Sequence, residues 1–354
     1  MSVLKKICAG LLSAVTVLCM CCSCNQSETK VIMTVGNEQV PAGVYIMYLN
    51  TAISELETEI AEAEYKGDKW DFKIEDKSAA EWVKDKAIQY TLELIAVERE
   101  FKKRGTKFTA EEQSNLDYIT DYYWMYYGSF YESMGVSYAS FARVQKGASL
   151  SQKMLIDQYG KDGTEPVSDE DLKTYMEENY MRVNHILISR YEDPKATTKV
   201  ELSEEKLKEA KSDAEDLFEQ AKNSDNVAFV ALIKKYSADY NASSTTESSL
   251  DLGMITPEEE SGYVEEFEKC ASELKPGETG FCESTYGWHI VRRYDMFEDE
   301  VVELDDYRDE IVVNMKEDDF NSARDSWVEA LRKEMVIVES SFDRYDPTSK
   351  KFND

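Results

Sequence analysis

The sequence is poor in histidine, in basic side chains and, beyond its first 24 residues, in cysteine. It contains two histidines, and 41 Lys and Arg stand against 71 Asp and Glu, which gives a formal net charge of −30. This shortage of positive charge excludes nucleic acid as a partner, because phosphate binding needs basic patches. It also argues against docking of the folded surface on anionic lipid.

Long hydrophobic runs are scarce as well. The apolar run 7–20 is too short to span a bilayer comfortably, and it follows two lysines, Lys5 and Lys6. A short positive segment followed by such a run is typical of an export signal. We therefore expect residues 1–24 to be a targeting segment and the rest of the chain to lie outside the cytoplasm.

The targeting segment ends in CMCCSC, which resembles the lipobox of bacterial lipoproteins. Cys24, preceded by Ser23, is the best acceptor for the lipid, and Cys21 is the second candidate. An ordinary cleaved secretory signal is the alternative. The resemblance implies that the mature protein is anchored to the membrane through an N-terminal lipid.

Only Cys270 and Cys282 remain beyond Cys24, out of seven cysteines in all. Outside the cytoplasm a disulfide between them is permitted. Both occupy apolar positions of helix-like or strand-like runs, so two buried thiols are the simpler interpretation. The spacing of the two cysteines and two histidines does not match the short paired spacings of structural zinc sites, and we expect no metal and no cofactor.

Residues 25–178 are expected to form a mostly helical domain. The segment KVIMTVG predicts a first strand, and Pro41 suits the first turn of the helix after it. Capping-box patterns predict further helix starts, and Gly105 ends one of these helices. The capping pairs are Ser78 with Glu81, Thr109 with Glu112, and Ser168 with Asp171.

Aromatic residues crowd into residues 118–131. Several recur at helical spacing, so one face of this helix packs in a core, but a single amphipathic helix cannot turn all of them inward. The surplus rings either pack between helices or line a cradle for unfolded chains. The eight residues are Tyr118, Tyr122, Tyr123, Trp124, Tyr126, Tyr127, Phe130 and Tyr131.

The two histidines lie near the two ends of residues 181–294. Apolar alternation in VNHILIS and WHIVRRY predicts two strands, each carrying one histidine. Five blocks in this stretch resemble, in order, the motifs of the parvulin family of peptidyl-prolyl isomerases. The blocks are His185–Ile188, Tyr236–Asp239, Asp251–Gly253, Phe267–Glu278 and Tyr286–Ile290.

The parvulin resemblance implies an α+β fold, a small antiparallel sheet wrapped by helices. The flanks resemble PrsA-type and SurA-type chaperones, in which such a domain is inserted in a mostly helical chaperone domain. We thus expect domains at 25–178, 179–297 and 298–354, the last a helix and strand that pack back on the first. The strand VIVES would then pair with VIMTV, and a separate C-terminal interaction module is the alternative.

The resemblance also assigns roles to individual residues. His185 and His289 correspond to the paired catalytic histidines, and Asp239 to the residue that fixes their tautomers. For substrate binding, the resemblance implies a proline pocket walled by Leu252, Tyr263 and Phe267, with Ser284 in the histidine network. The implied substrates are unfolded or partly folded exported proteins with X-Pro bonds.

Two departures from the family pattern leave a second function open. Residues 249–253 read SLDLG where the family has GGDLG, and Tyr263 stands where a methionine is usual. Two interpretations follow. The protein is an active prolyl isomerase and chaperone, or it is a catalytically inactive holdase that only binds unfolded clients.

Overall fold

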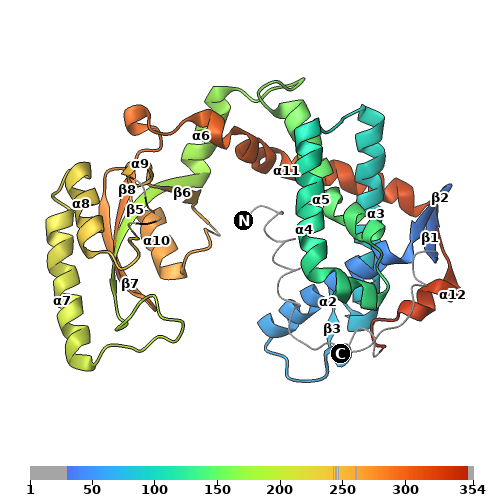
Figure 1. Ribbon diagram of the computed structural model, residues 1–354, viewed down its shortest axis with the longest axis horizontal. Helices are drawn as coiled ribbons and strands as arrows, with labels where there is room; N and C mark the ends of the chain where they lie inside the picture. The colour runs from blue at the N-terminus through green and yellow to red at the C-terminus, as the bar shows by residue number, and fades with distance from the viewer. Residues whose placement is uncertain (1–29, 242, 244, 246, 260, 350–354) are drawn as a thin grey trace. The chain divides into compact units, whose positions relative to one another are not determined.

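The structure is a computed structural model that describes residues 30–349, except 242, 244, 246 and 260. The expected targeting segment, with Cys24 and Cys21, lies outside the described residues. The chain divides into two compact units (Figure 1). We call residues 167–311 the central unit, and residues 30–166 together with 312–349 the helical unit. Both hold small antiparallel sheets among helices, which confirms the predicted α+β class.

The helical unit contains a three-stranded sheet built from both ends of the chain. The antiparallel order is β2-β1-β9, from β1 (Val31–Val35), β2 (Glu38–Pro41) and β9 (Met335–Ile337). Met33 lies opposite Ile337, so the expected pairing of VIMTV with VIVES is confirmed. The sequence did not predict β2, and Pro41 ends this strand and caps the next helix instead of entering its first turn.

The helices of this unit begin where the capping patterns predict. Ser78 and Thr109 both form complete capping boxes with the glutamates three residues later, and Gly105 ends its helix with φ +73°. The helices are α2 (Ala42–Glu62), α3 (Ala79–Arg104), α4 (Ala110–Met134), α5 (Tyr138–Tyr159) and α12 (Glu339–Phe342), together with α11 (Leu304–Arg332) from residue 312 onward. Short elements complete the chain: β3 (Lys73–Ile74), β4 (Lys77–Ser78) and 3-10 turns at Lys69–Asp71, Glu298–Glu300 and Asp343–Tyr345.

The aromatic helix α4 presents two different faces. Tyr131 is buried, and Tyr123, Trp124 and Tyr127 pack against the core of the helical unit. On its other face the rings are exposed: Tyr118 71%, Tyr122 46%, Tyr126 61% and Phe130 44%. The aromatic surplus of this helix therefore lies on the surface of the unit.

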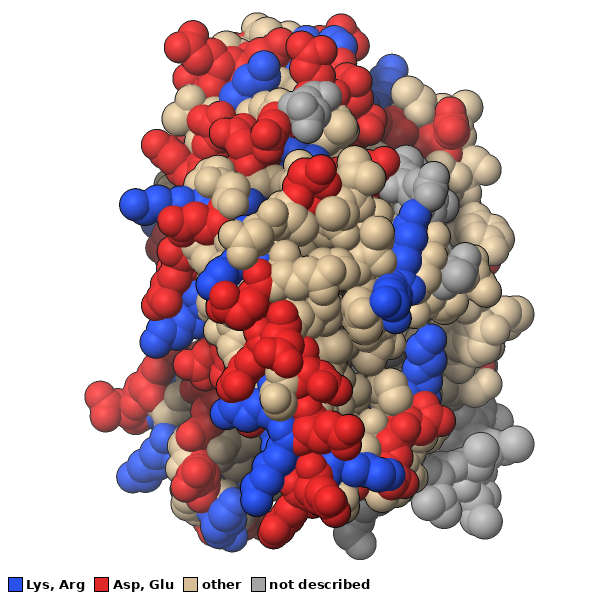
Figure 2. All heavy atoms as spheres, turned by 90° about the vertical axis from the view of Figure 1, so that its left-hand side faces the viewer, with Lys and Arg blue, Asp and Glu red and all other residues tan. Residues whose placement is uncertain are grey.

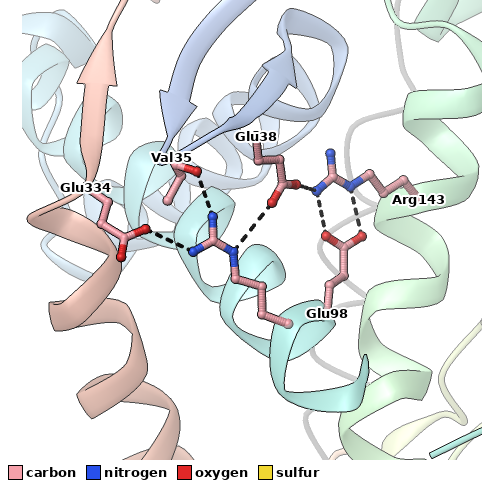
Figure 3. A network of polar contacts seen from close by, with 6 residues as sticks. Val35, Glu38, Glu98, Arg143 and Glu334 are labelled. Atoms are coloured by element: carbon pink, nitrogen blue, oxygen red, sulfur yellow. Dashed lines mark hydrogen bonds and ion pairs between the residues drawn. The ribbon is translucent and has the colours of Figure 1, made fainter. Parts of the chain in front are cut away.

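A network of ion pairs ties the sheet of the helical unit to its helices (Figure 3). Arg143 of α5 donates to both carboxylate oxygens of Glu98 on α3, at 2.8 and 2.5 Å, and to Glu38 of β2 at 2.6 Å. Arg99 donates to the carbonyl oxygen of Val35 at 2.7 Å and to Glu334, just before β9, at 3.1 Å. The network therefore fixes the returning C-terminal segment beside the first hairpin.

The central unit is organised around a four-stranded antiparallel sheet in the order β6-β5-β8-β7. Its strands are β5 (Tyr180–Ser189), β6 (Met254–Pro257), β7 (Thr279–Ser284) and β8 (Gly287–Tyr294). Its helices are α6 (Asp169–Asn179), α7 (Glu204–Ala221), α8 (Asn226–Tyr236), α9 (Glu247–Leu252) and α10 (Glu265–Glu273). The helix α6 contacts β5, so this unit starts before the boundary at 178/179 that we expected from the sequence.

The two faces of this sheet bury different clusters. Ile186 and Ile290 pack with α7 and α8, whereas Val183 and Val291 pack with Phe267 of α10. This division follows from the alternation of side chains along a strand. The face that carries α10 also carries His185 and His289, since these share the odd-numbered positions of β5 and β8.

Helix α9 starts at Glu247 and leads almost directly into β6. Buried side chains of β5 explain the helix. Arg182 donates to the carbonyl oxygens of Asp251 and Leu252, and Asn184 donates to that of Leu250. These bonds satisfy the last carbonyls of the helix, which otherwise lack partners.

Figure 2 shows the side of the central unit on which α7 and α8 lie. Most of the charged side chains on this side are acidic. Basic side chains there are scattered among the acidic ones, and an uncharged area lies between them.

Candidate active site

Two neighbouring strands bring the histidines together. β5 and β8 are antiparallel, with His185 opposite Val291 and His289 opposite Leu187. The histidines are therefore diagonal neighbours on one face of the sheet, where long side chains remain within reach. Their ring centroids are 5.6 Å apart.

Asp239 reaches His185 because the segment after α8 is bonded to β5. Leu187 donates its N–H to Ser237 Oγ at 3.0 Å and accepts from the N–H of Ala238 at 2.8 Å. These bonds present Asp239, whose Oδ2 lies 2.8 Å from His185 Nε2. With a carboxylate as acceptor, His185 Nε2 is the donor.

The carboxyl group of Asp239 is held in its ionised form. Burial opposes ionisation most strongly, but the hydrogen bond from His185 and the charges of both histidines together keep the pKa of Asp239 below its ordinary value. A carboxylate that accepts a hydrogen bond from a ring N–H also fixes the orientation of that ring.

His289 is buried and neutral. It is 5% exposed, and burial, with a smaller contribution from the charge of His185, lowers its pKa to about 4. Ser284 Oγ lies 2.8 Å from His289 Nε2 and already accepts from the N–H of Tyr286 at 3.1 Å. A hydroxyl can donate or accept, so this contact is compatible with either tautomer. We assign the Ser284 O–H as the donor to Nε2, which places the ring proton of His289 on Nδ1.

The Nδ1 atom of His289 has no hydrogen-bond partner within the described part of the chain. A buried donor without a partner costs on the order of 1–3 kcal/mol, so it calls for an explanation. This buried nitrogen is the unpaired polar atom among the residues of the site.

Aromatic and thioether side chains form the apolar part of the site. Phe267 makes edge-on contacts to both histidines, with centroids at 5.1 and 5.4 Å, and it is only 1% exposed. Tyr263 packs on Phe267 at 5.1 Å, is 43% exposed, and donates its hydroxyl to Met254 Sδ at 3.2 Å. Phe267 is thus the floor under the histidines, and Tyr263 with Met254 is the side that a substrate can reach.

The structure brings six of the seven catalytic and substrate-binding residues expected from the sequence into one group. The seventh, Leu252, ends α9, and among the described contacts it is joined to the unit by the bond from Arg182 to its carbonyl oxygen. Met254, two residues later, packs with the Phe267 cluster instead. Sequence reasoning missed Met254, although the absence of the usual methionine at Tyr263 was a signal to look for one nearby.

The other expectations concern metals and membranes. Among the described residues, no group of three or more His, Cys, Asp or Glu is placed to hold a metal ion. Cys270 and Cys282 are free thiols, both partly buried. Within the described chain, no helix is long and apolar enough to cross a membrane.

A twisted antiparallel sheet with paired histidines, an acid and an apolar floor defines the class of the central unit. Residues 171–296 match the family of the PPIC-type PPIASE domain, which confirms the parvulin resemblance. The protein therefore carries a parvulin-type peptidyl-prolyl isomerase domain.

Solved structures and curated proteins were also compared with the whole chain. It is similar to the foldase protein PrsA of Lactococcus lactis, at 18% identity and TM-score 0.35, covering 89% of this chain and 97% of that one. It is similar to PrsA of Bacillus subtilis at 22% identity and TM-score 0.28, covering 77% and 91%. A chain from the SurA-like chaperones PEB4 and Cj1289 of Campylobacter jejuni shows 13% identity and TM-score 0.23, covering 79% and 92%. No curated protein matches.

Proposed function

We propose that this protein is a prolyl isomerase and chaperone that assists the folding of exported proteins at the outer face of the membrane. The observation that carries the catalytic part is the polar network of the central unit. His185 is bonded to Asp239, His289 is bonded to Ser284, and His289 Nδ1 remains open. The substrates would be unfolded or partly folded chains with X-Pro bonds.

Rotation about an X-Pro bond requires no covalent chemistry. The barrier is about 20 kcal/mol because the C–N bond has partial double-bond character. In the twisted transition state the nitrogen regains its lone pair and becomes a better hydrogen-bond acceptor. A thousandfold acceleration requires about 4 kcal/mol of preferential stabilisation of that state.

We assign this stabilisation to the histidine pair and its floor. The N–H at Nδ1 of His289 would donate to the prolyl nitrogen in the twisted state, in a site made dry by Phe267 and Tyr263. Asp239 would act as a positioning residue through His185, and Ser284 through His289. In this arrangement His289 is neutral: Nε2 accepts from the Ser284 hydroxyl, and Nδ1 carries the proton that would be donated to the substrate.

The whole protein should accelerate the refolding of a substrate protein whose rate is limited by proline isomerisation. The rate should rise linearly with enzyme concentration for the wild type and much less for His289→Ala. Circular dichroism must show that this variant is folded. If the substrate refolds at its spontaneous rate in the presence of the wild-type protein, the proposed isomerase activity is wrong.

The second candidate is a holdase without turnover, and the exposed aromatic face of α4 favours it. Tyr122 and Tyr126 pack on each other at 4.9 Å and remain largely exposed, so they offer rings to an apolar segment of an unfolded chain. Replacing both by serine should reduce the suppression of client aggregation and leave prolyl isomerisation unchanged. If the double variant suppresses aggregation as the wild type does, the face has no role in client binding.

The anchor belongs to the same proposal. Two lysines, a short apolar run and Ser23–Cys24 support a lipid on Cys24, which would be the first residue of the mature protein. Mass spectrometry of the membrane fraction should find an acylated peptide that begins at Cys24. A peptide acylated at Cys21 would show that Cys21 is the lipidated residue. An unmodified soluble protein would contradict the lipid anchor.

A further inference from the structure

Two cysteines that the isomerase site does not use lie side by side in the central unit. Cys270 belongs to α10 and Cys282 to β7. Both are free and partly buried, and both pack against the same buried cluster around Phe267. They come from elements that are separate in sequence but packed together.

The backbone of β7 allows this close approach because it has a glycine under the helix. A methyl group placed on Gly280 would lie 3.2 Å from Cys270 Sγ and 3.0 Å from Leu274 Cδ2. Gly280 and Cys282 are two residues apart, so they share one face of the strand. The sulfur of Cys270 therefore lies over the same face of β7 that carries the Cys282 side chain.

The two thiols differ in acidity. The hydrogen bond from Cys282 lowers the pKa of Cys270, although burial opposes this, and the same bond, together with burial, raises the pKa of Cys282. The thiolate is the reactive form of a cysteine, so the lowered pKa favours Cys270 as the sulfur that attacks.

We propose that Cys270 and Cys282 form a dithiol–disulfide site, in which an external disulfide oxidises the pair and the new bond fastens α10 to β7. The Cys270 thiolate attacks one sulfur of the external disulfide and expels a thiolate. Cys282 then loses its proton and attacks Cys270 Sγ, which expels the second thiolate. The protein gives up two electrons and two protons, and the external disulfide becomes two thiols.

The cross-link would join the two elements that support the isomerase site. Cys270 lies one helical turn after Phe267, the floor of the site, and Cys282 lies two residues before Ser284, which bonds His289. Both side chains pack in one cluster, and Cys270 Sγ lies over β7 beside Gly280, so the two elements that the bond would join are already packed together. We therefore expect oxidation to stabilise the unit while isomerase activity changes less than about twofold.

Peptide mass mapping of the full-length chain tests the bond directly. Trypsin cleaves after Lys269 and Arg292 but not at Lys275, which precedes Pro276, so one fragment, 270–292, carries both cysteines apart from those of the leader. After reduction and then exposure to oxidised glutathione, this fragment should be two hydrogens lighter and resist alkylation. In calorimetry, the Tm of the central unit should rise by roughly 5–10 °C on oxidation.

Several outcomes would overturn the proposal. These are two alkyl groups on fragment 270–292 after oxidation, a glutathione adduct in place of the internal bond, or an unchanged Tm. Cys270→Ala and Cys282→Ala should each abolish both the mass change and the Tm shift. If either variant does not fold, the reduced and oxidised wild type still decide the question. None of these readouts depends on isomerase activity, so the proposal stands or falls separately from the proposed function.

Discussion

The two units use buried polar side chains in opposite ways. In the helical unit, Arg143 lies between Glu98 and Glu38, and this closed network joins segments distant in sequence. In the central unit, His289 is more deeply buried than these partly exposed groups, but it is bonded at only one of its two nitrogens. The first arrangement pairs its charged groups within the protein, and the second leaves one ring nitrogen without a partner among the described residues.

An orphaned atom alone does not mark a site. Tyr45 Oη and Trp82 Nε1 of the helical unit also lack partners among the described residues. What sets His289 apart is its neighbourhood, a second histidine bonded to an ionised acid, with a partly exposed tyrosine on one side. The difference between the units is that the unpaired nitrogen of His289 lies beside apolar rings and a second, hydrogen-bonded histidine.

The largest expected effect is on stability, and it tests whether the cores of the two units unfold independently. Phe267→Ala should destabilise the central unit by about 3–5 kcal/mol, because it removes a buried aromatic ring and leaves a cavity. The matched variant Phe141→Ala, also 1% exposed, should cost a similar amount in the helical unit. Denaturant titration should show each variant moving the transition of its own unit. A common shift of both transitions would contradict independent cores.

The second effect is the loss of stability that the central unit should show as its buried histidine becomes protonated, and both histidines of the sequence lie in this unit. The pKa of His289 is about 4 when folded and about 6.5 when unfolded, so the unfolded state binds a proton first as the pH falls. The contribution of His289 is therefore complete above pH 6.5 and is lost between pH 6.5 and 4, a change of about 3 kcal/mol. Below pH 4, protonation of Asp239, whose pKa is also lowered, removes further stability.

Denaturant titrations at several pH values measure this dependence. His289→Gln should flatten the curve of the central unit between pH 6.5 and 4 and leave the helical unit unchanged. If the wild-type central unit keeps its full stability down to pH 4, His289 is not held neutral by burial.

Much of this site was predictable because its parts lie in regular structure. Alternating apolar residues predicted that both histidines lie in strands, and the resemblance to the family motifs predicted the roles of Asp239 and Phe267. The displacement from Leu252 to Met254 was not predictable, because it depends on Arg182 and Asn184 holding α9 by its last carbonyls, a tertiary contact without a local pattern. The short strand β2 was not predicted for a related reason, because its four residues depend on pairing with β1 for their structure.

The smallest effect concerns the group behind His289. Ser284→Ala should cost about 0.5–1.5 kcal/mol of stability, the net value of one hydrogen bond, and leave Nε2 without a donor. The tautomer of His289 is then no longer fixed, so the isomerase rate should fall while substrate affinity is kept. Nitrogen-15 NMR of the imidazole should show protonation at Nδ1 in the wild type and a mixture in the variant. Protonation at Nε2 in the wild type would reverse our assignment.

The central claim is that the open histidine and its acid-oriented partner accelerate rotation of the prolyl bond. Exchange NMR on a short X-Pro peptide measures this directly. Such a peptide does not fold, so binding by a holdase would not change its rate of cis–trans exchange. We predict that the whole protein accelerates cis–trans exchange. Asp239→Asn should reduce the acceleration roughly tenfold to thousandfold, with folding intact, and Glu98→Gln in the helical unit should leave it unchanged. No acceleration by the wild type, or equal acceleration by folded Asp239→Asn, would contradict the account.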